Sequence, residues 1–247
     1  MKASPEEQLR LLELADLDAE LGRIDHRRQG LPEHAELREL QQRDAELRDS
    51  LAALEAEDGD LKRAQAKAES DVDQVRSRVD RDRTRLDAGQ VSSPRELENL
   101  QSEIVSLEHR QSDLEEVVLE VMERRESAGR SHVAATAERV QLAAALADVS
   151  ARRDAVLAEL AEQARKAEAR RAEAAAREPA ELLALYDRLR AQHDGVGAAA
   201  LRRGRCEGCH LSLNTVDLNT IRAAAPDEVL RCEECRRILV RTDESGL

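Results

Sequence analysis

The chain has 247 residues and a formal net charge of -13, and it contains no Trp, no Phe and a single Tyr. Charged residues make up 37% of the sequence, and most of its apolar residues are Ala and Leu. This composition excludes the wide aromatic core of a globular enzyme and favours narrow apolar seams between helices.

The first arm of the chain predicts two helices, over residues 5–29 and 33–88. Ser4-Pro5-Glu6-Glu7 supplies an N-cap, a first-turn proline and a capping-box partner. The tripeptide at 30–32 predicts a break, because its proline would remove a helical hydrogen bond and clash with the preceding turn. The heptad phase also changes there, since the seam upstream of the break resumes at Leu37 and not at residue 35.

Two stretches keep the alternating three- and four-residue spacing of a coiled coil. The first runs from Leu37 to Leu86, where eleven of fifteen seam positions are apolar, and the second runs from Leu97 to Leu160. Between them, Gly89 can end a helix and Ser93-Pro94 can start one. Residues 89–93 are therefore expected to form the tip of an antiparallel hairpin. Val91 in this tip is either an exposed partner contact or packs onto the last layer of the seam.

Polar residues inside the seams predict the register of the hairpin. They are Asp44, Asp58, Arg125, Arg139 and His132. A functional role stays open for them, but buried polar groups in coiled coils more often fix register. Asp44 with Arg139 and Asp58 with Arg125 share one fold-back axis near residue 91.5, which falls inside the predicted tip.

The return helix is expected to continue to a break at 178–179, followed by a short helix to about His193 and a linker at 194–197. The expected domains are a hairpin over residues 1–195 and a second domain over 196–247. Residues 196–247 contain eight arginines and eight acidic residues, so the whole net charge belongs to the hairpin. So acidic a hairpin should repel nucleic acid.

Four cysteines form two CxxC pairs in the second domain: Cys206, Cys209, Cys232 and Cys235. Two such pairs predict one structural Zn²⁺ in a closed tetrahedral site. Two disulfides and a redox-active pair are the alternatives. A redox pair is expected in a βαβ unit, which is absent from the pattern here, and disulfides suit small secreted domains. The sequence shows no apolar signal core and no run that could span a bilayer, so we expect a cytoplasmic location.

Within the second domain, strands are expected at 210–213, 228–231 and 237–241, with helical turns over 215–224 capped by Asn214. His210 is interpreted as a surface residue. Arginines flanking the cysteine pairs are candidate contacts for nucleic acid or a protein partner: Arg202, Arg203, Arg205, Arg236, Arg237 and Arg241. Ordinary surface arginines are an equal alternative, and no aromatic residue is present to stack bases.

The CEGCH-L-S-L stretch and the closing EVLRCEECRRILVR, after a long helical hairpin, resemble the bacterial C4-type zinc-ribbon family with an N-terminal coiled coil, a domain-of-unknown-function family. The resemblance implies that Cys206, Cys209, Cys232 and Cys235 bind zinc. It also implies nucleic-acid-binding or adaptor roles, and some members are tied to flagellar or secretion-system partners.

The predicted fold is mainly α, a long antiparallel coiled-coil helical hairpin followed by a small C-terminal four-cysteine zinc ribbon. The primary hypothesis is a non-enzymatic adaptor that binds protein partners through the hairpin, with nucleic acid possible at the ribbon. The alternative is an RNA- or DNA-binding protein that uses the ribbon arginines. An enzyme is the weakest hypothesis, because the six histidines fit no catalytic motif and no Gly-rich phosphate loop exists. We expect no membrane contact and no small-molecule substrate.

Overall fold

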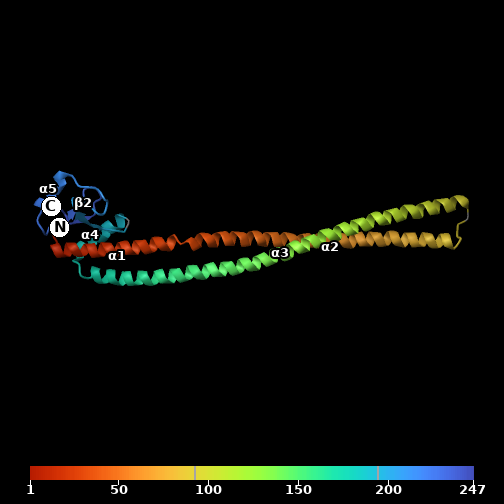
Figure 1. The fold of residues 1–247 in the computed structure, drawn as a ribbon, viewed down its shortest axis with the longest axis horizontal. Helices are drawn as coiled ribbons and strands as arrows, with labels where there is room; N and C mark the ends of the chain where they lie inside the picture. The colour runs from red at the N-terminus through yellow and green to blue at the C-terminus, as the bar shows by residue number, and fades with distance from the viewer. Residues whose placement is uncertain (92, 194) are drawn as a thin grey trace. The chain divides into compact units, whose positions relative to one another are not determined.

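The structure is a computed structural model that describes residues 1–91, 93–193 and 195–247 (Figure 1). Its helices are α1 (Pro5–Gln29), α2 (Pro32–Asp87), α3 (Pro94–Ala175), α4 (Ala180–Gln192) and α5 (Thr215–Ala223). Its strands are β1 (Ala198–Arg202), β2 (Arg205–Cys206), β3 (Leu230–Arg231) and β4 (Ile238–Val240). The chain packs as two compact units, residues 36–149 and residues 1–35 with 150–247. They are described in turn.

In the unit of residues 36–149, α2 and α3 run antiparallel as a coiled-coil hairpin (Figure 1). The buried residues of α2 all occupy seam positions predicted from the sequence: Leu37, Asp44, Leu47, Leu61, Ala68, Val72, Val79 and Asp82. Those of α3 in this unit do so as well: Leu100, Ile104, Leu114, Ala128, Leu142 and Val149. Heptad spacing therefore selects the buried face of both helices.

Acid–base pairs across the hairpin confirm the predicted register. Arg139 Nε lies 3.0 Å from Asp44 Oδ1, and Arg125 Nε lies 2.9 Å from Asp58 Oδ1. Arg48 on the next turn also binds Asp44, and the hydrogen bonds from Arg48 and Arg139 hold the pKa of this carboxyl below its usual value. These pairs make a shift of either helix by one heptad unfavourable, since each carboxylate would lose its partner.

The tip of the hairpin follows the expected helix signals. Gly89 has a φ of 65°, a left-handed value that ends a helix readily only at glycine. Ser93 Oγ accepts a hydrogen bond of 3.3 Å from the Glu96 amide, as an N-cap does. Val91 packs beside Leu86 against a cluster built on Val79, so its side chain contributes to the seam and is not a free contact at the tip. Residue 92 of the tip and residue 194 of the expected linker lie outside the described residues.

In the other unit, α1 begins with the predicted capping box, in which Ser4 Oγ and the Glu7 carboxylate each accept a hydrogen bond from the other residue's amide. The helix ends at Gln29, and α2 begins at Pro32. Leu31, between them, is buried with Ile24 against Leu160 of α3. The change of heptad phase thus coincides with a real interruption of the helix.

A buried carboxylate joins α1, α3 and α4. Asp18 Oδ2 accepts a 2.7 Å hydrogen bond from the Tyr186 hydroxyl, and Asp18 Oδ1 accepts one of 2.6 Å from Arg171 Nε. Arg190 Nε also lies 3.0 Å from Oδ1. The Asp18 side chain is fully buried, so these partners replace the water that its charge has lost. We call these four residues the Asp18 cluster.

Tyr186 provides a spectroscopic test of this cluster, because the chain has no other tyrosine and no tryptophan. Burial, and then the hydrogen bond to Asp18, raise the pKa of Tyr186 above its ordinary value of 10.0. The folded state therefore disfavours the phenolate. The resulting stabilisation is fully present below about pH 10 and is lost as the pH rises further.

In an ultraviolet absorbance titration, we expect no phenolate signal from the folded protein at about pH 10, and a transition near that pH once urea unfolds the chain. A phenolate transition near pH 10 in the folded protein would contradict the buried hydrogen bond.

The helix α3 ends at Ala175, earlier than the expected break at 178–179. Glu178 is buried where the chain turns, and its Oε1 accepts a 2.8 Å hydrogen bond from Arg10 Nε of α1. Pro179 disfavours helical geometry at the residue before it, so the helix ends ahead of this proline. The short helix that follows ends at Gln192, close to the expected position.

The ribbon forms a sheet in the order β2-β1-β4-β3. Its central pair, β1 and β4, is parallel, and the other neighbours are antiparallel. The strands near 228–231 and 237–241 and the α5 helix capped by Asn214 were predicted. The strand predicted at 210–213 is reduced to a single bridge between Ser212 and Arg205, because His210 with its left-handed φ of 60° still belongs to the CxxC turn. The strands β1 and β2 were missed. The Ala198-Ala199-Ala200 run of β1 has low strand propensity, and pairing with β4 and β2 overrides that preference.

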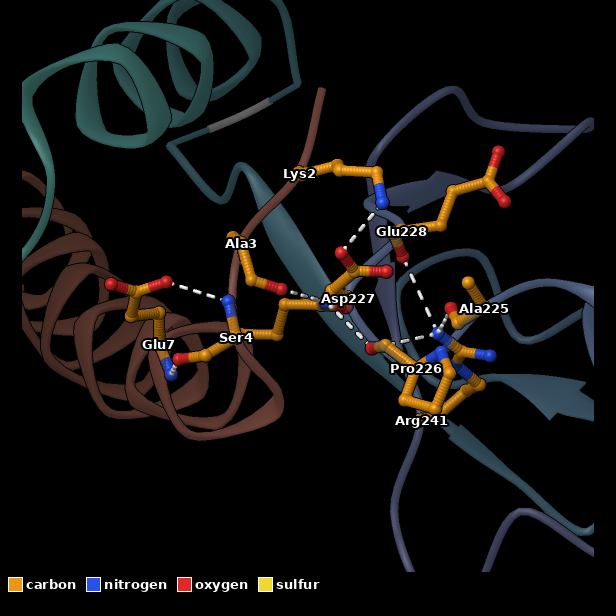
Figure 2. Close-up of polar contacts among 10 residues, drawn as sticks. Lys2, Ala3, Ser4, Glu7, Ala225, Pro226, Asp227, Glu228 and Arg241 are labelled. Carbon is orange, nitrogen blue, oxygen red and sulfur yellow. Dashed lines mark hydrogen bonds and ion pairs between the residues drawn. The ribbon is translucent and has the colours of Figure 1, made fainter.

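The first residues of the chain pair with the segment just before β3 (Figure 2). The Ala3 amide donates to Asp227 O at 2.8 Å, and the Val229 amide donates to Met1 O at 3.2 Å. Lys2 Nζ also lies 2.8 Å from Asp227 Oδ2. The start of the chain and the ribbon therefore form one packed structure, together with the core shared by α1, α4, β1 and β4.

Candidate metal centre

The two CxxC segments fold into turns of the same design. The Cys206 amide donates to Leu211 O and the His210 amide donates to Cys206 O, at 3.0 and 2.8 Å. The Cys232 amide donates to Arg237 O and the Arg236 amide to Cys232 O, at 3.0 and 2.9 Å. His210 and Arg236 occupy equivalent positions, with φ of 60° and 61°. Each turn therefore directs two thiols to one side.

The sulfur atoms of all four cysteines lie close together. Their sulfur atoms lie within 4.8 Å of one another, and the Cys206–Cys235 and Cys209–Cys232 sulfur pairs are each separated by 3.9 Å. A zinc ion with Zn–S bonds of about 2.3 Å in tetrahedral geometry requires sulfur separations of about 3.8 Å. The same distances exclude a disulfide, whose sulfurs are about 2.05 Å apart. The cluster suits one structural zinc ion.

The surroundings of the thiols also fit a bound cation. Cys206 and Cys232 are buried, and burial raises the pKa of both thiols, so apolar packing alone would keep them protonated. A metal ion supplies the positive charge that stabilises thiolates in such a place. Among the residues that the structure describes, this is the one group of three or more Cys, His, Asp or Glu side chains arranged to hold a metal. His210 is not part of it.

The apolar core around the site is small. It consists of Ala199, Leu201, Leu213, Ile221 and Leu239 with the two buried cysteines. Gly208 fits closely beneath it, since a Cβ there would lie 2.8 Å from Ala199 Cβ and 2.9 Å from Arg237 Cδ. So small a core needs a metal to remain folded.

Two of the six candidate arginines serve the fold itself. The Arg237 guanidinium donates to the carbonyls of His193, Val196 and Gly208 at 3.0 to 3.1 Å. Arg241 donates to a group of carbonyls at the end of α5 and the turn after it, including Ala225 and Pro226 (Figure 2). Both guanidiniums are thereby committed within the chain and have little capacity left for phosphate.

The other four candidate arginines are exposed. Arg202 pairs with Glu244 at 2.7 Å, and Arg236 pairs with Glu233 at 3.2 Å. Arg203 lies in the turn between β1 and β2, with a φ of 49°, and Arg205 begins β2. Of the six candidate arginines, two are therefore bound within the fold, two are paired with acids, and Arg203 and Arg205 have exposed side chains.

Sequence comparisons match both parts of this architecture. Residues 14–194 match the CT398-like coiled coil hairpin domain, and residues 205–239 match the C4-type zinc ribbon domain. The chain belongs to the CT398-like hairpin family. The resemblance drawn from the cysteine motifs is thus confirmed.

Relatives of this CT398-like chain preserve the whole architecture. The uncharacterized protein Rv2229c of Mycobacterium tuberculosis is 40% identical, and the alignment covers 98% of each chain. A solved structure from Mycobacterium smegmatis is 38% identical, with a TM-score of 0.83 over 98% of this chain and 100% of that one. CT398 from Chlamydia trachomatis is 18% identical, with a TM-score of 0.77 over 96% and 98%, and shows the shared fold.

The structural roles of Arg237 and Arg241 were not anticipated, although the sequence held a signal for them. In a strand, residues 237, 239 and 241 lie on one face. Leu239 between them is buried in the ribbon core, so the two guanidiniums start from the inner side of the strand. A charged residue at such a position must find partners within the fold.

Proposed function

We propose that this CT398-like protein is a non-enzymatic adaptor whose hairpin binds protein partners, with the zinc ribbon as a second contact site. The observation that carries the proposal is an exposed, nearly uncharged side of α3. Residues 127–147 include only three charged residues, Arg130, Glu138 and Arg139, in a chain that is 37% charged. An apolar surface of this kind on a helix is typical of a protein–protein contact.

The proposed zinc ligands are Cys206, Cys209, Cys232 and Cys235, and the role of the metal is structural. Four thiolates fill the tetrahedral sphere, so no position remains for a substrate or a reactive water. These residues bind and orient the ion, and the ion in turn holds the two CxxC turns together. A metal ion whose coordination sphere is filled by protein ligands supports the proposal that the ribbon is a binding module and not an enzyme.

We further propose that the hairpin comprises residues 1–195 and the ribbon residues 196–247, and that the protein works in the cytoplasm, where thiols stay reduced for zinc. The boundary is supported by the end of α4 at Gln192 and the start of β1 at Ala198. Among the described residues, no helix is both long and apolar enough to cross a bilayer.

Nucleic-acid binding by the ribbon is the second candidate. The exposed side chains of Arg203 and Arg205 favour it, because phosphate binding depends on such charges. Against it stand the internal hydrogen bonds of Arg237 and Arg241 and the acidic partners of Arg202 and Arg236. We therefore give the protein partner precedence.

A pull-down from a native lysate, with and without nuclease, separates the two functions. We expect the captured proteins to be unchanged by nuclease and by the double substitution Arg203→Glu with Arg205→Glu. Binding of labelled RNA or duplex DNA should be no tighter than the general non-specific range of about 10⁻⁴ to 10⁻⁶ M at physiological salt. Arg203→Lys with Arg205→Lys, which keeps the charge, is the matched control.

The adaptor proposal fails if the protein binds RNA or DNA much more tightly than this, if that binding weakens steeply with salt and with the glutamate substitutions, and if nuclease removes every captured protein.

A further inference from the structure

A second row of heptad-spaced residues runs along α3, on a side that α2 does not cover. Its members are Leu119, Met122, Glu126, Gly129, Val133, Thr136, Val140, Ala143 and Ala147. All nine are exposed, including Leu119 at 58%, Val133 at 69% and Val140 at 67%. We call this row the outer seam. Each member follows a position of the inner seam by one residue, so the row keeps the same three- and four-residue steps and lies along one face of α3, where another helix could pack.

The polar groups of the outer seam are already satisfied within the helix. Glu126, its one charged member, pairs with Arg130 at 2.6 Å. The Thr136 hydroxyl donates to His132 O at 2.8 Å, which leaves its methyl group for contact with a neighbour. Glu138 and Arg139 beside the row are bound to residues of α2. The surface therefore offers apolar contact with little charge to desolvate.

Gly129 leaves the backbone of α3 open within the outer seam, as Gly22 does in α1. Glycine in the interior of a helix is destabilising, so its presence needs a reason. A Cβ at this position would meet no atom of the chain within 4 Å, so packing inside the molecule does not require glycine. A close approach by a backbone or a side chain from outside would require it.

We propose that the outer seam binds the outer seam of a second copy of this chain, antiparallel, to form a dimer. This inference rests on the proposed function, since it names the partner of that same face of α3. A contact between identical patches is the usual way in which a soluble homodimer closes.

The sizes of the side chains favour an antiparallel copy. The row begins with large residues, Leu119 and Met122, and ends with small ones, Ala143 and Ala147. The separation of two packed helices depends on the size of the side chains between them. A parallel pair would place large residues against large ones at one end and small against small at the other, so the two helices could not keep one separation. With the two-fold axis between residues 134 and 135, Met122 faces Ala147 of the other copy and Gly129 faces Val140. Glu126 faces Ala143 in the same way, and Val133 faces Thr136 at the centre, so three of these four pairs combine a larger residue with a smaller one.

The length of the outer seam is sufficient for such a contact. Residues 119–147 cover about 42 Å at 1.5 Å per residue, or about four heptads. Sustained coiled-coil pairing needs three to four. Residues 119–147 contain four acidic and four basic residues, so this segment is formally neutral in an acidic chain and its self-association does not bring a net like charge together.

Sedimentation equilibrium of the full-length, zinc-loaded protein tests the dimer. We expect the mass to rise with concentration from 27.5 kDa towards twice that value. The double substitution Val133→Glu with Val140→Glu should raise the dimer dissociation constant about a hundredfold or more, because each copy then places two charges in the contact. Helix content should be unchanged, since both side chains point to solvent in the single chain and Glu is a better helix former than Val.

Val105→Glu is the matched control. Val105 is an exposed valine on α3 at the same heptad position as Val133, but it lies before the outer seam begins. We expect this variant to associate like the parent protein. Equal weakening by Val105→Glu would overturn the assignment to the outer seam.

Orientation is tested by mixing Met122→Cys protein with Ala147→Cys protein under mild oxidation. An antiparallel dimer should give a disulfide between the two different variants. Each variant alone should not give it, and these single-variant samples also report any link through the four native cysteines. Links between like variants would overturn the antiparallel arrangement.

The inference and the proposed function can fail separately. A parent protein that remains monomeric at every concentration, while Val133→Glu with Val140→Glu releases a captured protein of another kind, overturns the dimer and leaves the adaptor standing. A stable dimer that is lost in the same double variant supports the inference, whether or not any other protein is captured.

Discussion

Replacement of Cys232 by Ser is expected to remove zinc and unfold the ribbon. Three thiolates and a serine hydroxyl do not reproduce the four-sulfur site, and structural zinc contributes an apparent free energy of about 10–16 kcal/mol to the folding of small domains. The amount of bound zinc should fall from about one equivalent per chain to near zero. The backbone amides of the ribbon should lose their protection from hydrogen exchange.

The hairpin should keep most of its helix in the same variant. Residues 36–149 pack as a unit of their own. At the start of the chain the effect should be visible, because Leu11 and Leu14 of α1 and Tyr186 of α4 share a core with Ile238 and Val240. We therefore expect far-UV helicity to fall only by the part that α4 and the first turns of α1 contribute.

Leu211→Ser is the control, since Leu211 closes the other CxxC turn, is half exposed and is no thiol. It should keep its zinc. Full zinc occupancy in Cys232→Ser would refute the four-thiolate site, and a collapse of helicity throughout the chain would refute the independence of the hairpin.

Substitution of Asp18 by Ala is expected to destabilise the unit of residues 1–35 and 150–247 by about 3–5 kcal/mol, the usual cost of removing one partner from a buried ion pair. Arg171 and Arg190 would lose their shared carboxylate, and the Tyr186 hydroxyl would lose its acceptor. Asp18→Asn should cost less, because its amide oxygen still accepts a hydrogen bond. Urea unfolding followed by the fluorescence of Tyr186 measures the loss in this unit directly.

Asp16→Ala is the matched control for this prediction. Asp16 is an exposed residue of the same helix, two positions away, and its substitution should change stability by less than about 0.5 kcal/mol. If Asp18→Ala were as mild as Asp16→Ala, the Asp18 cluster would not hold the three helices together.

The hairpin and the metal site could be predicted because their signals are local and periodic. Heptad spacing identified the buried face of α2, and the CxxC pairs identified the four thiols that converge. The register followed from two acid–base pairs, Asp44 with Arg139 and Asp58 with Arg125, because both pairs fit the same fold-back position.

Contacts between segments distant in the chain escaped prediction. The strand β1 is mostly alanine and exists because β4 and β2 pair with it. The first residues of the chain pair with residues 227–229, and neither segment has a periodic sequence pattern that predicts this pairing. The contact between Glu178 and Arg10 likewise has no signal in the local sequence around either residue.

The acid–base pairs of the hairpin constrain how its length can vary. Loss of seven residues from α2 alone, between Asp44 and Asp58, would displace one pair from its partner by about 10.5 Å while the other stayed in place. Removal of one heptad from each arm at equivalent positions would keep both pairs, the seam and the tip. Shorter and longer hairpins of this kind are therefore compatible with the same ribbon only when their two arms grow or shrink in matched sevens.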